Sequence, residues 1–293
     1  MENTRKIKAV FRAQRVTEGA GVRLKRIFSS NELKLTDPFL LLDDFHSDRK
    51  EDYIKGFPWH PHRGIETITY VLHGDVEHGD SIGNSGVISD GDVQWMTAGS
   101  GIIHQEMPKG DKDGLMWGFQ LWANLPKSEK MCAPKYRDVK SSDIPELTLD
   151  NGIKIKIICG EVDGVKGPVS DIAIRPEYLD VTIPAEKVFM RSFESSFTVM
   201  AYVIQGSVNV MGDEAEPDSD PDGDPVREEQ LILFESGDQI QLKAGTKGVR
   251  LILVSGKPLN ESVAWYGPIV MNTDEEIETA RRELNDGTFL KSR

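Results

Sequence analysis

Short runs of β-branched and aromatic residues recur along the chain, separated by turn sequences such as Gly-Asp and Asn-Gly. Clear examples are ETITYVL (66–72), IKIKII (153–158), FTVMAYVI (197–204) and VRLILV (249–254). Runs of this length and composition, bounded by turn residues, are typical of β-strands. Their spacing favours an antiparallel sandwich or barrel over alternating strands and helices, so the pattern predicts an all-β protein.

One segment near the C-terminus has the spacing of a helix instead. In TDEEIETARRELNDG (273–287), Thr273 and Glu276 fit a capping box, and Gly287 is placed to end the helix. Apolar residues at 277, 280 and 284 form one stripe. We therefore predict a helix over 273–286 that packs against the strands.

Two pairs of segments suggest that the β-region is duplicated. YVLHGDV (70–76) resembles YVIQGSV (202–208), and GDVQWMTAG (91–99) resembles GDQIQLKAG (237–245). The two pairs occur in the same order along the chain, which is the pattern that an internal repeat produces. The repeat predicts two β-barrels, one over residues 1–135 and one over 136–293, the second carrying an acidic insertion at 213–229.

Composition narrows the function classes. The 293 residues include 35 basic and 48 acidic side chains, for a net charge of −13, which argues against direct binding to nucleic acid or to anionic membranes. The two cysteines, at positions 132 and 159, show no metal or redox spacing. With no apolar leader segment and no run of 18 apolar residues, the sequence predicts a soluble, cytoplasmic protein.

The acidic insertion leaves two interpretations open. DSDPDGDPVREE (218–229) matches the EF-hand loop formula at Asp218, Asp220, Asp222, Gly223 and Glu229. Its flanks, however, are strand sequences rather than helices, and the three prolines of the whole insertion, 213–229, favour an extended loop. We expect a solvated excursion from a hairpin, with calcium binding as the alternative.

The strongest chemical signal is the placement of the histidines. All six lie between positions 46 and 104: His46, His60, His62, His73, His78 and His104. Residues two apart on a strand point to the same face, so His60 and His62 project together, as do His104 and Glu106. Two such pairs facing each other can surround one ion with three imidazoles and a carboxylate. We expect the other three histidines to be solvated.

Imidazole and carboxylate ligands suit Fe, Ni, Cu, Zn or Mn, and a His-rich set with open positions favours non-haem Fe(II). Glu66 has the same parity as His60 and His62 if their strand continues unbent. The offset between the first two repeated segments, 70–76 and 202–208, places Ser192 and Glu194 at the positions of His60 and His62. The second barrel is therefore expected to lack the metal site.

The chain resembles the pirin family of the cupin superfamily, whose fold is a bicupin, two cupin-type β-barrels in one chain. The matching segments are EGAGVRLKR (18–26), DPFLLLDDF (37–45), HPHRGIET (60–67), WMTAGSGIIHQEMP (95–108), GFQLWANLP (118–126) and AWYGPIVMNTDEEI (264–277). The resemblance implies an iron-type metal in the N-terminal barrel, held by His60, His62, His104 and Glu106. It gives Glu66 a supporting place behind the metal ligands rather than one among them.

The resemblance also implies two classes of function. One is a metal-dependent dioxygenase of the quercetin 2,3-dioxygenase type, acting on a small aromatic substrate and O2 with Glu106 as general base. The other is a non-catalytic metal-binding protein that senses redox state or regulates transcription. We expect a monomer. Apolar and aromatic side chains near the ligands could line a substrate pocket, although for any single one of them packing in the barrel core is the simpler interpretation: Phe57, Trp59, Trp95, Met96, Met107, Trp117, Phe119 and Trp122.

Overall fold

The computed structural model describes residues 3–212 and 225–291 and divides the chain into two compact units. One unit, the N-terminal barrel, comprises Gln14–Ser141 with Leu259–Arg293; the other, the C-terminal barrel, comprises Met1–Ala13 with Ser142–Pro258. This division differs from the predicted ranges of 1–135 and 136–293. The chain begins in the C-terminal barrel because its first strand pairs there, and it ends in the N-terminal barrel.

The N-terminal barrel has a seven-stranded sheet in the order β12-β9-β6-β11-β4-β3-β2 and a four-stranded sheet in the order β5-β10-β7-β8. Their bounds are β2 (Gln14–Glu18), β3 (Val22–Phe28), β4 (Phe39–Ser47), β5 (Phe57–His62), β6 (Ile65–His73), β7 (Asp75–Asp80), β8 (Ser85–Ile88), β9 (Val93–Thr97), β10 (Ile102–Lys109), β11 (Met116–Asn124) and β12 (Lys135–Val139). This unit also contains α1 (Leu33–Thr36), α2 (Lys50–Tyr53), the hairpin β23 (Ala264–Tyr266) and β24 (Ile269–Met271), and α3 (Asp274–Asn285).

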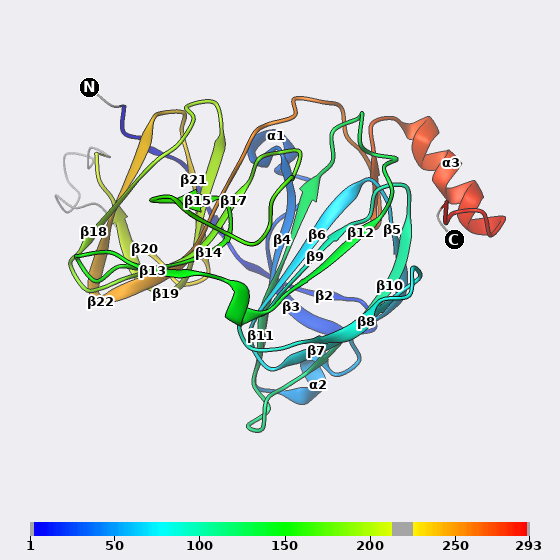
Figure 1. The fold of residues 1–293 in the computed structure, drawn as a ribbon, viewed down its shortest axis with the longest axis horizontal. Coiled ribbons are helices and arrows are strands. Elements are labelled where there is room, and N and C mark those ends of the chain that lie inside the picture. The colour runs from blue at the N-terminus through cyan, green and yellow to red at the C-terminus, as the bar shows by residue number, and fades with distance from the viewer. Residues whose placement is uncertain (1–2, 213–224, 292–293) are drawn as a thin grey trace. The chain divides into compact units, whose positions relative to one another are not determined.

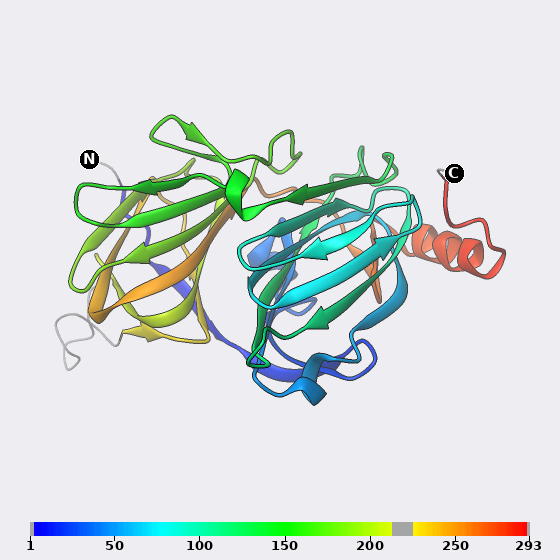
Figure 2. The ribbon, with the colours of Figure 1, turned by 60° about the horizontal axis from the view of Figure 1, so that its bottom comes forward.

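The C-terminal barrel has one nine-stranded sheet that runs β1-β21-β19-β22-β17-β14-β13, with β18 paired to β22 and β20 to β19. Its elements are β1 (Ile7–Arg12), η1 (Ser141–Asp143), β13 (Glu146–Thr148), β14 (Lys154–Cys159), β15 (Glu161–Val162), β16 (Val165–Lys166), β17 (Glu177–Ile183), β18 (Val188–Ser192), β19 (Thr198–Val210), β20 (Val226–Arg227), β21 (Gln230–Phe234) and β22 (Gln239–Gly256). In each unit the strands curve around to form a barrel (Figures 1 and 2). The predicted all-β, two-barrel architecture is confirmed.

The strand orders of the two sheets correspond, which supports the duplication inferred from the sequence. The order β6-β11-β4-β3-β2 in one barrel is matched by β19-β22-β17-β14-β13 in the other. Gly74 and Gly206, which are equivalent in the YV..G.V repeat, both adopt a positive φ, of 88° and 81°. Only glycine takes this conformation readily, so the repeated glycine preserves the same turn in both copies.

Strand register corrects the second half of the predicted repeat. Val76 pairs with Pro108 in the N-terminal barrel, and the equivalent Val208 pairs with Ala244 in the C-terminal barrel. Counting back along each strand, the positions of His104 and Glu106 correspond to Ile240 and Leu242. Residues 237–245 are therefore the counterpart of 101–109, not of 91–99, and both replacements are fully buried aliphatic side chains.

The interiors of the two barrels differ accordingly. The C-terminal barrel is filled by one continuous cluster of apolar side chains, which includes Ile240 and Leu242. The described residues of the N-terminal barrel form several separate apolar clusters and, in addition, include buried polar side chains such as His62, His104 and Glu106. Because burying a polar group without a partner costs free energy, these side chains need a compensating role.

The predicted C-terminal helix is confirmed as α3, drawn in red in Figure 1. The Thr273 side chain accepts a hydrogen bond from the Glu276 backbone, and the Glu276 side chain bonds back to the cap, which completes the capping box. Ile277 and Ala280 are buried, and α3 packs against β23 and β24. Leu284 packs against the same cluster.

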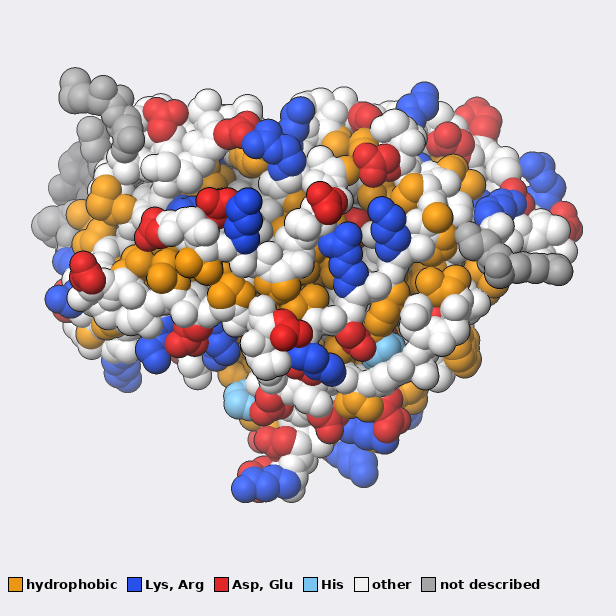
Figure 3. All heavy atoms as spheres, viewed as in Figure 1, with side chains coloured by type: hydrophobic (Ala, Val, Ile, Leu, Met, Phe, Trp, Pro, Cys, Tyr) orange, Lys and Arg blue, Asp and Glu red, His pale blue; other side chains and the backbone are white. Residues whose placement is uncertain are grey.

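None of the helices among the described residues is long and apolar enough to cross a membrane. On the face drawn in Figure 3, acidic and basic side chains are interspersed rather than gathered by sign. Residues 213–224 lie outside the described part of the chain, and with them most of the EF-hand-like segment 218–229.

Candidate metal centre

The site is built on two paired strands of the four-stranded sheet. In the antiparallel pairing of β5 with β10, His104 lies opposite His60, and Ile102 lies opposite His62. Side chains at 104 and 106 alternate in burial with their neighbours, as expected for a strand with one face turned inward. The three imidazole rings meet with centroid separations of 4.4 to 4.9 Å.

The three histidines each offer one ring nitrogen to a common point. These nitrogens lie within 4.8 Å of one another, and no other group of three or more His, Cys, Asp or Glu side chains in residues 3–212 and 225–291 is so arranged. The predicted clustering of His60, His62 and His104 is therefore observed. His62 and His104 are buried, whereas His60 is half-buried at the edge of the cavity.

Hydrogen bonding fixes which nitrogen of the His60 and His62 rings faces inward. Nδ1 of His60 lies 2.8 Å from the carbonyl oxygen of Pro58, and Nδ1 of His62 lies 3.2 Å from that of Pro268. A carbonyl oxygen can only accept, so each Nδ1 carries the proton and donates. The unprotonated Nε2 atoms then point at each other, 3.0 Å apart.

This arrangement suits a cation. Two nitrogen lone pairs face each other, and protonation of His62 to relieve their repulsion is disfavoured, because burial, together with His104 and His60, holds its pKa well below the usual range. Nε2 of His104 is also buried and has no hydrogen-bond partner among the described residues. Such outward-anchored, inward-unprotonated imidazoles are the typical arrangement of histidine metal ligands.

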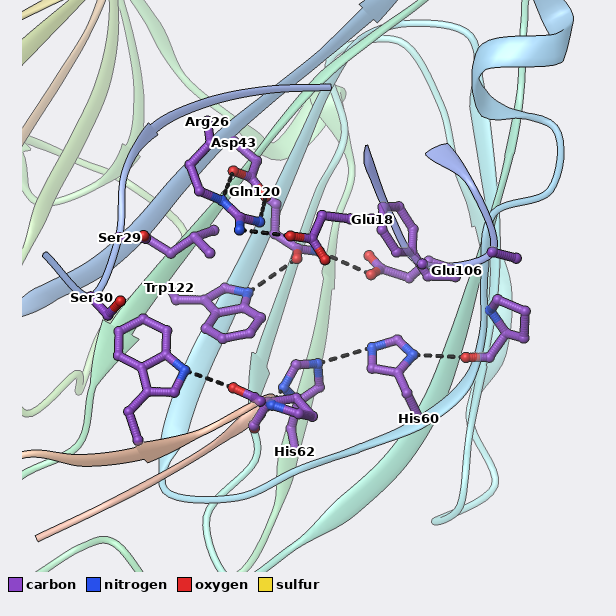
Figure 4. Close-up of a pocket in the computed structure, with 18 residues that line it drawn as sticks. Glu18, Arg26, Ser29, Ser30, Asp43, His60, His62, Glu106, Gln120 and Trp122 are labelled. Atoms are coloured by element: carbon purple, nitrogen blue, oxygen red, sulfur yellow. Dashed lines mark hydrogen bonds and ion pairs between the residues drawn. The ribbon is translucent and has the colours of Figure 1, made fainter. Parts of the chain in front are cut away.

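Glu106 lies in the same cavity, held by two hydrogen bonds. Its Oε1 accepts from Thr69 Oγ1 at 2.9 Å, and its Oε2 accepts from Gln120 Nε2 at 2.9 Å. The side chain is 3% exposed and lines the cavity together with His60 and His62 (Figure 4). A carboxylate has about four lone-pair positions, so two remain for a cation or a proton.

Glu66 does not share the face expected from its parity. The chain turns at Gly64, which has a φ of 77°, so β5 and β6 are separate strands in different sheets. The carboxylate of Glu66 accepts hydrogen bonds from Trp95 Nε1 at 3.1 Å and Thr97 Oγ1 at 2.8 Å. Burial raises its pKa, and it does not line the cavity.

The cavity beside the imidazoles has a volume of about 580 Å³ and is partly aromatic. Of the apolar and aromatic residues selected from the sequence, Phe57 and Trp122 line it, while Trp95 and Phe119 are buried elsewhere and Trp59 is exposed. Trp122 and Phe119 have opposite parity on β11, which explains why only one of them faces the cavity.

The far end of the cavity carries charges that the sequence did not single out. Arg26 donates to both oxygens of Asp43 at 2.9 and 2.8 Å, and to Glu18 at 2.7 Å (Figure 4). Burial raises the pKa of Asp43 to about 6, although the Arg26 bonds oppose the shift. All three residues fall in segments that support the family resemblance, but no spacing rule joins them.

The other histidines have mixed positions. His46 is exposed and stacks on Trp117 at 4.0 Å, and His73 is half-buried. His78 contradicts the expectation of a solvated side chain, since it is 6% exposed and hydrogen-bonded to the Tyr136 hydroxyl. It was expected in a polar turn, but it lies on β7, directly opposite Glu106 on β10.

The C-terminal segment completes the site from far along the sequence. Trp265, Gly267 and Pro268 line the cavity, and Trp265 stacks on Trp122 with centroids 5.9 Å apart. Next to His62, the buried Arg63 donates to the carbonyl oxygens of Ser100 and Phe289, both at 2.8 Å. The contacts of His62 with Pro268 and of Arg63 with Phe289 join residues 206 and 226 positions apart, so local patterns could not predict them.

Comparison with known proteins agrees with this geometry. The pirin family model matches residues 21–123, and the model of the pirin C-terminal cupin domain matches residues 178–290. A pirin-like protein of Caulobacter vibrioides is 40% identical over 286 residues, covering 97% of this chain and 99% of that protein.

Two solved structures extend the comparison. A quercetin 2,3-dioxygenase from Acinetobacter baumannii is 31% identical, with a TM-score of 0.86 and 98% of each chain covered. A bacterial pirin of Escherichia coli, solved in complex with nickel(II), shares the fold at 19% identity, with a TM-score of 0.62 over 85% of this chain and 99% of that one. The chain therefore belongs to the pirin family, with a bicupin fold.

Proposed function

We propose that this protein is a metal-dependent dioxygenase of the flavonol-cleaving type, with its centre in the N-terminal barrel. The observation that carries the proposal is the convergence of three imidazoles, two of which line a cavity that also holds a carboxylate and aromatic walls. Apolar cavities with a few convergent polar groups are the usual form of small-molecule sites.

His60, His62, His104 and Glu106 are the residues that would hold the ion. A set of three imidazoles and one carboxylate accepts several transition metals, of which we propose Fe(II), with nickel, copper, manganese and zinc as alternatives. When bound, the ion would supply Lewis-acid and one-electron redox chemistry toward the substrate and O2. The nickel found in the Escherichia coli pirin is consistent with a site of this kind.

The chain's own residues would bind and orient the substrate. Trp122 and Trp265 form one aromatic wall, suited to hold a flat ring by stacking. Glu106 would accept the proton of the substrate's enolic hydroxyl on a carboxylate oxygen, leaving the substrate as an oxyanion. The hydrogen bonds from Thr69 and Gln120 keep that carboxylate turned into the cavity.

The charged end of the cavity favours a neutral, hydroxylated substrate. Glu18 and Asp43 together carry one more charge than Arg26 neutralises, so that end is net negative near neutral pH. Carboxylate oxygens accept hydrogen bonds from phenolic hydroxyl groups but repel an anionic group. A polyhydroxylated aromatic compound therefore fits better than an aromatic acid.

The alternative of a metal-bearing sensor without turnover is less well supported. A sensor does not need a substrate-sized space beside the metal, so a closed barrel would favour the sensor hypothesis. Here the cavity of about 580 Å³ reaches His60, His62 and Glu106. No described residue of the site identifies a protein partner.

Oxygen uptake on addition of quercetin tests the proposal. Iron-loaded or nickel-loaded wild-type protein should consume oxygen in proportion to the quercetin lost, and His62→Ala should lose this activity. His73→Ala, which removes a half-buried imidazole outside the cavity, is the matched control and should stay active. Undiminished uptake in His62→Ala, or none in metal-loaded wild type, would contradict the proposal.

A further inference from the structure

We infer that Gln120 and Trp122 are positioning residues for Glu106, acting in series, with the indole N–H of Trp122 setting the orientation of the Gln120 amide. The inference rests on the proposed role of Glu106 at the metal centre. It concerns two residues of β11 that no ligand pattern in the sequence selects.

The three side chains form a continuous hydrogen-bonded line. Trp122 Nε1 donates to Gln120 Oε1 at 3.0 Å, and Gln120 Nε2 donates to Glu106 Oε2 at 2.9 Å. Gln120 and Trp122 are two residues apart on β11, so both face the cavity, and both line it (Figure 4).

The direction of the line follows from the chemistry of its ends. An indole N–H can only donate, and an ionised carboxylate can only accept. Gln120 lies between them and must present its oxygen to Trp122 and its nitrogen to Glu106. Without the indole donor, the amide would be held only through its nitrogen, by Glu106 and, at 3.4 Å, by Thr69 Oγ1, and its position would be less closely fixed.

The line also fixes the plane of the carboxylate. Thr69 lies on β6, directly opposite Gln120 on β11, and its Oγ1 donates to Oε1 of Glu106. With one donor on each oxygen, Glu106 has a single orientation, and its remaining lone pairs have fixed directions. Groups that orient a metal ligand in this way affect affinity or activity by about 10- to 100-fold when removed.

Trp122 further connects this line to the contents of the cavity. Its ring lies edge-on to His62, with centroids 5.1 Å apart and an interplanar angle of 89°. A flat molecule stacked on Trp122 thus touches the same side chain that orients Glu106. Substrate contact and carboxylate orientation are coupled through one indole.

A double-mutant cycle on nickel(II) affinity tests the inference without requiring turnover. Trp122→Phe keeps an aromatic wall but removes the N–H, and Gln120→Leu removes the amide. We expect each to weaken nickel binding by about tenfold, and the double variant to be no weaker than Gln120→Leu alone, since residues acting in series are not additive.

Trp117→Phe is the matched control. Trp117 lies on the same strand, and its indole N–H has no hydrogen-bond partner among the described residues. The nickel affinity of Trp117→Phe should stay within about twofold of wild type. Additive effects in the double variant, or equal losses in Trp117→Phe and Trp122→Phe, would overturn the inference.

If the protein turns over a flavonol, a kinetic readout is available as well. Trp122→Phe should lower kcat by about tenfold with little change in KM, because it keeps the stacking surface and disturbs only the reacting carboxylate. A rise in KM at constant kcat would instead make Trp122 a substrate-binding wall alone, which would overturn its positioning role. A protein that binds nickel but oxidises no flavonol contradicts the proposed function while the affinity cycle still decides the inference.

Discussion

His60 and His62 present their Nε2 atoms to each other at 3.0 Å, while the Nδ1 atom of each is anchored on a backbone carbonyl. Two neighbouring lone pairs repel unless a cation lies between them and His104. Metal binding should therefore stabilise the N-terminal barrel, since a ligand present at about 100 times its Kd adds roughly 2.7 kcal/mol to the free energy of unfolding.

Thermal unfolding with and without nickel(II) measures this effect. Wild type and His73→Ala should both show a higher Tm with the metal, and His62→Ala should show little change. An equal rise in all three proteins would mean that nickel binds elsewhere on the folded chain.

The pH dependence of stability should report on Asp43. Burial raises its pKa to about 6 from an unfolded value near 3.8, so the folded state binds the proton more tightly than the unfolded state. Its contribution to stability is present in full below about pH 4 and is lost as the pH rises through 6.

Comparison of wild type with Asp43→Asn by urea denaturation isolates that contribution. As the pH rises from 4 to 7, wild type should lose up to about 3 kcal/mol of unfolding free energy relative to Asp43→Asn. A difference that is constant over this range would place the pKa of Asp43 close to its unfolded value.

Arg63 should be a structural clamp that does not tolerate lysine. Its guanidinium donates to Ser100 and Phe289 oxygens, lies 4.2 Å from the Phe289 ring centre, and pairs with Glu283 at 2.7 Å. Lysine cannot reproduce this planar set of contacts. Arg63→Lys should lower the free energy of unfolding by about 2 kcal/mol.

The exposed Arg49 provides the control for Arg63. Its ion pair with Glu51 lies on the surface, where such pairs contribute little, so Arg49→Lys should unfold like wild type. Equal stability of the two lysine variants would show that the buried contacts of Arg63 are not needed.

The charged end of the cavity should set substrate preference. Quercetin should bind more tightly than galangin, the analogue without hydroxyl groups on its pendant ring, by about tenfold if one hydrogen bond is gained. Glu18→Gln should reduce the repulsion of aromatic acids, whose binding can be followed by quenching of tryptophan fluorescence. If Glu18→Gln binds aromatic acids as weakly as wild type does, Glu18 takes no part in substrate recognition.

Local patterns were sufficient to identify the histidine pairs. The alternation of a strand places His60 with His62, and His104 with Glu106, whatever the rest of the fold does. The same rule failed for Glu66, because the turn at Gly64 ends one strand and starts another in a different sheet. The position of His78 was wrong for another reason: EHGDS has the composition of a turn, but its residues 77–80 form the end of β7.

The remaining parts of the site depend on long-range packing. Pro268 and Trp265 reach His62 and Trp122 from the C-terminal hairpin, and no local signal connects them. The second repeat pair was misaligned for a related reason. Its Gly-Asp and Ala-Gly ends are common turn sequences, whereas equivalence is set by the pairing of Val208 with Ala244.

Metal content tests the central claim most directly. Protein purified without a histidine tag or chelators, and reconstituted with iron or nickel where needed, should hold close to one transition metal ion per chain by elemental analysis. His62→Ala should hold far less, and His73→Ala the same amount as wild type. Failure of the wild-type protein to retain any transition metal after reconstitution would contradict the account.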